Sequence, residues 1–295
     1  MSLVDAHVHL YPPEADPDPS AWAAARGEKH WALLCTRRRK DGRRVQSLPT
    51  LRDLLAEMDR AGVGRAVLLG WYWEKFETCV EQNRFYAQCL RERPDRLSAF
   101  AAFHPAAGRA AVLDEIRRAH DTGLGGLGEL SPHSQGFAID DPVFGAALDL
   151  AAELKLPVNL HVTDPESARY PGWVSTPLED FVTIARRYPA TTFILAHWGG
   201  RLPLKIPAVQ ALANVYYDTA ASPLLYDEGI WRTFLAAVPK ERVLFGSDFP
   251  LNLYPRIDAE PNLTRLVAEL HRSGLSAEQL SAIAGANARR LLGLG

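Results

Sequence analysis

The chain has 295 residues, of which 47% are hydrophobic and 23% are charged, and its formal net charge is −2. This balance is typical of a globular, enzyme-sized protein and excludes a disordered or fibrous chain. Because there is no basic excess and no apolar run near the roughly 18 residues that cross a bilayer, we expect neither nucleic acid nor a membrane as a partner.

Eight strand-like segments alternate with helix-like segments along the chain. The expected strands are 3–10, 65–71, 97–104, 126–131, 157–163, 192–198, 214–220 and 243–250. The stretches between them include 50–62, 110–123, 142–156 and 177–188, which have apolar residues at three- and four-residue spacing. Eight such units predict a single α/β domain over residues 1–295, a closed (β/α)8 TIM barrel, and an open doubly wound sheet is the alternative.

Two segments interrupt this alternation. Residues 11–48 form a long polar insertion that contains Trp22, Trp31 and the basic run 37–40. Active sites of such barrels lie at the carboxyl ends of the strands, so an insertion after the first strand is expected to cap the site. The basic run is interpreted as a solvated loop, and residues 259–292 are expected to form two or three helices that close the barrel.

The cysteines and the start of the chain indicate a reducing compartment. Cys35, Cys79 and Cys89 form no CxxC pair, and their odd number fits inert thiols better than a disulfide framework. The chain begins directly with its first apolar strand, without a basic and apolar leader. We therefore expect a cytoplasmic protein.

The first strand carries a polar stripe in the segment VDAHVHL, residues 4–10. Alternate side chains of a strand share one face, so Asp5, His7 and His9 point together while the apolar residues between them point away. A stripe of one carboxylate and two imidazoles is not ordinary core.

Four other predicted strands also end in titratable residues. These are Glu129, His161, His197 and Asp248, at the ends of strands four, five, six and eight. In a barrel they would meet the histidines of strand one at a single mouth. Each alone is more simply interpreted as a hydrogen-bonded core residue, but together they are the ligands of Zn²⁺ or a similar divalent metal.

The motifs around these residues form an ordered series. It consists of HVH in the first strand, His161 in NLHV, His197 in ILAHWGG and Asp248 in FGSDFP. This series resembles the amidohydrolase superfamily, specifically its second large family, which includes aminocarboxymuconate semialdehyde decarboxylase. The ending GANARRLLGL is similar to that family's terminal helix, and the resemblance covers the chain except for the 11–48 insertion.

The resemblance implies a metal centre. In similar family members, one ion is held by the residues that match His7, His9, His161 and Asp248, while the residue that matches His197 acts in catalysis. Zn²⁺ is the ion expected first, with Mn²⁺ or Fe²⁺ as alternatives.

Glu129 makes a second metal ion possible. It is similar to a glutamate that bridges two metals in binuclear relatives such as the TatD-like nucleases, in which the equivalents of His161 and His197 bind the second ion. Ser131 and Pro132 depart from the TatD-like pattern, so the nuclease activity is not carried over. One ion is expected, and two could be held through Glu129 and His197.

A metal of this kind implies a mechanism. Bound Zn²⁺ lowers the pKa of its water to roughly 7 and polarises a substrate carbonyl. Asp248 would take the proton of that water and pass it to the leaving group, while His197 would orient the water or stabilise an oxyanion. Asp5 lies deeper in the strand and is expected to support the ligands rather than to bind the metal.

Residues that could bind a substrate follow strands two, three and five. Trp71, Tyr72 and Trp73 in GWYWE could form an aromatic wall for a planar substrate or pack against the insertion, and His104 ends strand three. Arg169 and Tyr170 could hold a carboxylate, although a surface salt bridge is the commoner fate of such an arginine. The predicted substrate-binding residues are Trp71, Trp73, His104, Arg169 and Tyr170.

Three functions are compatible with these residues. The first, which we take as the main prediction, is metal-dependent hydrolysis of an ester, lactone or amide bond in a small carboxylated or ring-containing substrate. The alternative is nonoxidative decarboxylation of a small aromatic or unsaturated carboxylate. A metal-stabilised binding protein is the third, but a closed structural site would need no spare base such as His197. The expected partner is a small molecule, and a homodimer is compatible with the sequence.

Overall fold

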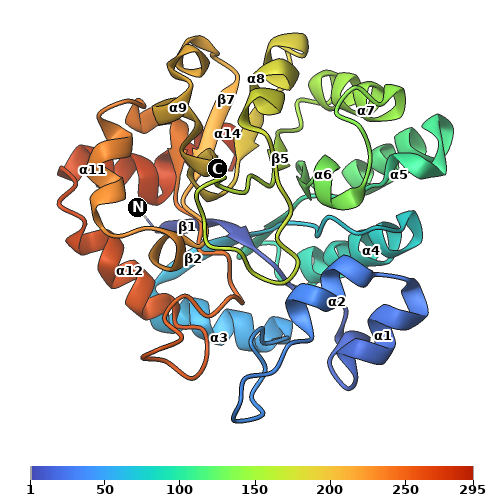
Figure 1. The fold of residues 1–295 in the computed structure, drawn as a ribbon, viewed down its shortest axis with the longest axis horizontal. Helices are drawn as coiled ribbons and strands as arrows, with labels where there is room; N and C mark the ends of the chain where they lie inside the picture. The colour runs from blue at the N-terminus through green and yellow to red at the C-terminus, as the bar shows by residue number, and fades with distance from the viewer. Residues whose placement is uncertain (1, 295) are drawn as a thin grey trace.

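Eight parallel strands form the centre of the part that the computed structural model describes, residues 2–294, and helices surround them (Figure 1). The strands are β1 (Leu3–Val8), β2 (Val63–Leu68), β3 (Leu97–Ala99), β4 (Leu127–Leu130), β5 (Val158–Leu160), β6 (Phe193–Leu195), β7 (Val215–Asp218) and β8 (Val243–Leu244).

The strands are neighbours in chain order, and backbone hydrogen bonds close the circle. Each strand pairs in parallel with the next within β1–β3 and within β4–β8. Between β3 and β4, the Gly128 N–H donates to the Ala101 carbonyl at 2.8 Å. Between β8 and β1, the Ala6 N–H donates to the Phe245 carbonyl at 2.8 Å. The chain therefore forms the predicted (β/α)8 barrel and not an open sheet.

The strands end earlier than the sequence pattern predicts. The predicted strand 243–250 corresponds to β8 at Val243–Leu244, and the predicted strand 97–104 corresponds to β3 at Leu97–Ala99. Beyond these points the chain leaves the strand conformation while it still carries side chains into the mouth. Asp248, for example, has a φ of +69°, which lies in the left-handed region and not in the strand region.

The longer helices cover the outside of the barrel (Figure 1). The clearest start and stop signals belong to α3 (Leu51–Ala61), where Thr50 and Asp53 form a capping box and Gly62 ends the helix with a φ of +71°. None of the helices within residues 2–294 is long and apolar enough to cross a membrane. The remaining helices are α1 (Pro19–Arg26), α2 (Lys29–Cys35), α4 (Phe76–Glu92), α5 (Arg109–Asp121), α6 (Pro132–Gln135), α7 (Pro142–Glu153), α8 (Leu178–Arg187), α9 (Leu202–Lys205), α10 (Ser222–Leu225), α11 (Gly229–Leu235), α12 (Leu263–Arg272), α13 (Ala277–Ser281) and α14 (Asn287–Leu292).

The insertion 11–48 is docked on the barrel through a buried aromatic cluster. It contains α1 and α2, whose Trp22 and Trp31 pack against Trp73 from the segment after β2. The buried Glu28 carboxylate accepts hydrogen bonds from the N–H groups of Glu74 and Lys75, at 2.8 and 3.1 Å. These contacts hold the insertion next to the segment that follows β2.

Candidate metal centre

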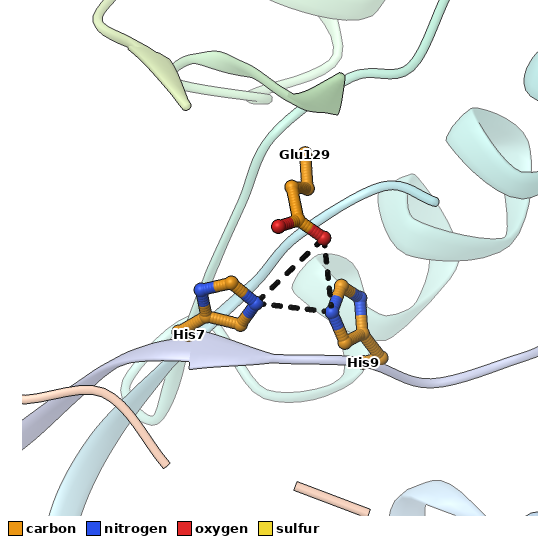
Figure 2. Close-up of side chains that lie close together, drawn as sticks. All are labelled: His7, His9 and Glu129. Carbon is orange, nitrogen blue, oxygen red and sulfur yellow. Dashed lines mark hydrogen bonds and ion pairs between the residues drawn. The ribbon is translucent and has the colours of Figure 1, made fainter. Parts of the chain in front are cut away.

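His7 and His9 face each other at the carboxyl end of β1. Their Nε2 atoms lie 3.1 Å apart, and both rings are buried (Figure 2). His7 Nδ1 lies 2.9 Å from Asp218 Oδ2, and His9 Nδ1 lies 3.1 Å from the Leu69 carbonyl oxygen. Because both of these oxygens accept, the Nδ1 atoms are the donors and the Nε2 lone pairs are free for a metal. Two Nε2 atoms this close share either a proton or a metal ion.

Two carboxylates from other parts of the barrel complete this arrangement. Glu129 in β4 places Oε2 3.9 Å from His7 Nε2 and 3.7 Å from His9 Nε2 (Figure 2). Asp248, beyond β8, places Oδ1 3.7 and 3.5 Å from the same two atoms. Ligands that bind a metal at about 2.0–2.2 Å lie about 3 to 4 Å from one another, so this spacing fits a divalent ion. We call these four residues the first ligand group.

A second ligand group consists of Glu129, His161 and His197. Glu129 Oε1 lies 3.0 Å from His161 Nδ1 and 3.5 Å from His197 Nε2, and these two nitrogens are 3.1 Å apart. The two oxygens of Glu129 thus face different groups, which is the arrangement of a bridging carboxylate. The resemblance implies His161 as a ligand beside His7 and His9, whereas the structure places it with Glu129 and His197.

A left-handed turn positions His197. From His197 to Arg201 every φ lies between 56° and 62°, so the segment HWGGR turns in the left-handed sense directly after β6. Gly199 and Gly200 adopt this conformation at little cost, and a Cβ on Gly199 would lie 2.8 Å from the Tyr217 ring. The turn lets the His197 N–H donate to Asp218 Oδ1 at 3.1 Å.

Asp218, at the end of β7, is a site residue that the sequence analysis misses. It is fully buried and accepts hydrogen bonds from His7 Nδ1, from Asn159 Nδ2 at 3.0 Å and from the His197 N–H. It therefore orients one histidine from each ligand group. The signal was present in VYYDTA, because this aspartate ends a predicted strand just as Glu129 and Asp248 do.

Replacing Asp218 by Asn should weaken metal binding by about 10- to 100-fold, the usual effect of removing the partner that orients a ligand histidine. The amide keeps the shape of the carboxylate but gives up its charge and one acceptor atom beside His7. Titration of the metal-free protein with Mn²⁺ by isothermal calorimetry measures the change. The exposed Asp149→Asn in α7 is the matched control, and an unchanged Mn²⁺ affinity in Asp218→Asn would contradict this role.

The electrostatics of the first ligand group favour a cation. Burial by itself lowers the pKa of His7, but the carboxylates of Asp218, Glu129 and Asp248 outweigh it and raise that pKa to about 10. Burial and the neighbouring charge of His7 lower the pKa of His9 to about 3. Three carboxylates thus make the protein interior attractive to positive charge at this point, as a divalent metal requires.

The pKa values of the two buried carboxyl groups, Asp248 and Glu129, are shifted in opposite directions. Burial raises the pKa of Asp248 to about 6, although His7 and His197 oppose this. Glu129 is buried too, but its histidine neighbours, first among them His161, hold its pKa well below the ordinary range.

Asp5 supports the backbone of the site. Its Oδ1 atom accepts hydrogen bonds from the N–H groups of His7 at 3.2 Å and Ser247 at 2.9 Å. It thereby ties β1 to the segment that leads into Asp248. The sequence analysis expects this supporting role, and the contacts are compatible with it.

Two residues of the aromatic segment after β2 lie beside the site: Trp71, whose ring centroid is 5.3 Å from that of His9, and Tyr72. Trp73 is fully buried against the insertion and donates its Nε1–H to Gln82 Oε1 at 2.6 Å. Trp71 lies beneath Tyr72, with ring centroids 4.4 Å apart. Tyr72 is the member of the trio whose ring approaches the second ligand group, at 5.0 Å from the ring of His161. Trp73 thus packs against the insertion, which was the alternative to a substrate wall.

The other predicted substrate-binding residues are His104, Arg169 and Tyr170, and each has different surroundings. Both ring nitrogens of His104 are engaged with backbone, Nε2 with the Gln135 carbonyl at 3.0 Å and Nδ1 with the Ala106 N–H at 3.2 Å. The Arg169 guanidinium lies over the Trp173 ring, 3.2 Å from its centroid. Tyr170 is 38% exposed.

The insertion meets the loop that carries Tyr170. His30 of α2 donates its Nε2–H to the Gly172 carbonyl at 2.8 Å, and Leu34 packs beside the same glycine. The insertion and the loop after β5 thus touch above the carboxyl ends of the strands, where a cap is expected.

Comparisons with known proteins identify the family of the chain. A sequence model described as amidohydrolase matches residues 4–294. No curated protein sequence matches the chain.

Solved structures match over the full length. They include 2,6-dihydroxybenzoate decarboxylase from Rhizobium, with 18% identity, a TM-score of 0.70 and coverage of 100% of this chain and 99% of that one. Another is 5-carboxyvanillate decarboxylase from Sphingomonas paucimobilis, with 17% identity, a TM-score of 0.75 and coverage of 100% and 99%. A third is 5-carboxyvanillate decarboxylase from Novosphingobium aromaticivorans, complexed with manganese, with 16% identity, a TM-score of 0.75 and coverage of 99% and 96%. At these identities the likeness shows the fold.

Proposed function

Because the chain belongs to the amidohydrolase family, we propose that it is a metal-dependent enzyme that decarboxylates a small aromatic or unsaturated carboxylate without oxidation. The observation that carries this proposal is the position of Asp248, whose Oδ1 lies within 3.7 Å of both Nε2 atoms of the histidine pair. This carboxyl group stands beside the place where a metal-bound carboxylate would lie. The full-length likeness to decarboxylases favours this alternative over the hydrolysis that the sequence analysis puts first.

The first ligand group would hold the cation, and a cation there would supply positive charge to offset the negative charge of a substrate carboxylate. During the reaction the bond between the ring carbon and the carboxylate carbon breaks, carbon dioxide leaves, and the electron pair stays on the ring carbon. Asp248 in its protonated form then gives its carboxyl proton to that carbon, so that a C–H bond replaces the C–C bond, and the carboxylate takes up a proton from water before the next turnover. His197 is the second candidate proton donor. Its Nδ1 lies 3.2 Å from the Ala220 carbonyl oxygen, and its Nε2 faces the ligand groups, 3.5 Å from Glu129 Oε1.

The proposal is tested by following two products from the same protein sample. Protein loaded with Mn²⁺ or Zn²⁺ would be incubated with hydroxybenzoates, including 2,6-dihydroxybenzoate, and separately with lactones and esters. Release of carbon dioxide from a hydroxybenzoate, lost on metal removal and restored by metal, is the expected result. Acid release from a lactone or ester with no carbon dioxide from any carboxylate would contradict decarboxylation.

Hydrolysis is the second candidate, and one observation favours it. Glu129 directs one oxygen to each ligand group, so the chain has ligands for two ions, a common arrangement in metal-dependent hydrolysis. The ion itself is also part of the proposal: manganese is the ion named with three similar structures, and Zn²⁺ is the ion expected from the sequence.

Metal analysis of His161→Ala separates the two ligand groups. We expect the wild type to hold one tightly bound ion in the first ligand group and His161→Ala to retain it, because His161 lies with Glu129 and His197 instead. Elemental analysis of dialysed protein measures the ions per chain. A wild type with two ions, reduced to one in His161→Ala, would contradict the single-ion proposal and would favour hydrolysis.

A further inference from the structure

The segment after β5 is a loop whose two ends are held together at its base. The Thr163 N–H donates to Thr176 Oγ1 at 2.8 Å, and the Thr176 hydroxyl donates back to the Thr163 carbonyl at 3.1 Å. Thr163 Oγ1 also lies 3.2 Å from His161 Nε2, so the base of the loop lies at the second ligand group. In Figure 1 this yellow-green loop passes in front of the strands and reaches toward α2. A loop with a closed base can move as a unit about that base.

One limb of the loop is fixed to the barrel. Asp164 is buried, and its carboxylate accepts hydrogen bonds from Arg201 Nε at 2.5 Å and from Lys205 Nζ at 3.1 Å. The Tyr226 hydroxyl donates to the same carboxylate at 2.9 Å. Glu166 pairs with the same arginine and lysine, at 2.6 and 3.0 Å. This limb is therefore held by ion pairs and hydrogen bonds to the segments that follow β6 and β7.

The rest of the loop, residues 167–175, packs against itself, and we call it the strap. The Trp173 Nε1–H donates to Ser167 Oγ at 3.1 Å, and the Arg169 guanidinium lies over the ring of the same tryptophan. None of the residues of the strap is buried. Segments with few buried contacts open locally at a low cost in free energy, so the strap can open while the barrel stays folded.

The insertion holds the strap through α2. His30 Nε2–H donates to the Gly172 carbonyl oxygen at 2.8 Å, and a Cβ on Gly172 would lie 2.8 Å from the Leu34 side chain. The centroid of the His30 ring is 5.5 Å from that of Tyr72, which in turn lies 5.0 Å from that of His161. The contact between the strap and the insertion is therefore two aromatic rings away from the second ligand group.

We propose that the strap is a gate to the two ligand groups, which swings about its base, and that the hydrogen bond from His30 to Gly172 is the latch that keeps it closed. The limb at Asp164 is fixed, so breaking the latch frees the strap without breaking the ion pairs. A closed lid of this kind slows the entry and release of small molecules and ions. The gate would act in the same way whichever reaction the metal centre performs.

Cleavage by trypsin after the exposed Arg169 measures how often the strap opens, because proteolysis of such a segment follows the population of its open form. His30→Ala removes the donor of the latch. Gly172→Ala acts from the other side, because φ at Gly172 is +88° and the added Cβ would meet Leu34. Each variant should raise the cleavage rate at this bond about two- to tenfold, the effect of losing one hydrogen bond.

Two controls separate opening of the strap from general loosening. Cleavage after the exposed Lys40, in the same insertion, should keep the rate of the wild type in both variants. His271→Ala, which removes an exposed histidine in α12, should leave cleavage after Arg169 unchanged. Faster cleavage at Lys40 as well as at Arg169 would mean that the whole insertion is loosened and would overturn the latch.

Exchange of Mn²⁺ tests whether the strap controls access to the ligand groups. Uptake of the ion by metal-free protein and its release to a chelator would be followed by stopped flow. In His30→Ala both rates should rise about two- to tenfold, while the dissociation constant of Mn²⁺ stays unchanged, because the strap supplies no residue of either ligand group.

Three results would overturn the proposal: unchanged cleavage after Arg169 in both variants, unchanged rates of Mn²⁺ exchange, or a weaker affinity for Mn²⁺ in His30→Ala. The last would mean that His30 supports the metal centre itself and does not act as a latch. Absent carbon dioxide release would count against decarboxylation alone, since neither measurement requires turnover.

Discussion

His9→Ala is expected to abolish metal binding and to lower turnover by about three orders of magnitude or more. His9 supplies one of the two Nε2 atoms of the first ligand group, and no neighbouring side chain can take its place because His9 is buried between His7 and Trp71. A metal contributes several kcal/mol of charge stabilisation in reactions of this type, and roughly 4 kcal/mol corresponds to a thousandfold change in rate.

Elemental analysis after dialysis and carbon dioxide release measure the two effects of His9→Ala together. His271→Ala provides the control, because His271 is an exposed histidine in α12 far from the ligand groups in the sequence. Circular dichroism shows whether the variant is folded. A folded His9→Ala protein with the full metal content of the wild type would remove His9 from the ligands and with it the first ligand group as defined above.

Asp248→Asn should lower turnover by about 10²- to 10⁴-fold, the range typical of a lost general acid or base. Asn has the same shape as Asp but no carboxyl group that can carry and release a proton. The protein would be measured at saturating Mn²⁺, since Asp248 also belongs to the first ligand group and the amide is a weaker ligand.

Two comparisons separate proton transfer from metal loss in Asp248→Asn. Metal content is measured on the same sample as turnover, and the exposed Asp149→Asn in α7 serves as the control for a change of charge. If Asp248→Asn holds its metal and turns over within about threefold of the wild type, Asp248 is not the proton donor. His197→Ala would then be the next variant to measure.

The sequence alone predicted the barrel and the histidines and carboxylates of the two ligand groups, although not Asp218, which supports them. Alternation in VDAHVHL places His7 and His9 on one face, and the ends of parallel strands meet at one rim, so the convergence of Glu129, His161 and Asp248 follows from order along the chain. These inferences need only two facts: side chains alternate along a strand with a period of two, and all the strands run parallel.

The tertiary structure decided how these residues are grouped. Whether His161 joins the histidines of β1 or joins His197 depends on the stagger of the strands around the barrel, which no local period specifies. The left-handed turn from His197 to Arg201 and the positive φ of Asp248 likewise direct these side chains in ways that strand alternation does not describe.

The structure also decided which polar and aromatic groups remain free. Tyr72 and Trp73 are neighbours in the sequence, yet the Tyr72 ring lies beside His161 whereas the Trp73 ring is buried against the insertion. Asp218 looks like any other residue at the end of a strand until its four hydrogen-bond donors are seen. Hydrogen-bond partners and packing contacts come from segments far apart in the chain, so the availability of a side chain is set by distances across the fold and not by its place in the sequence.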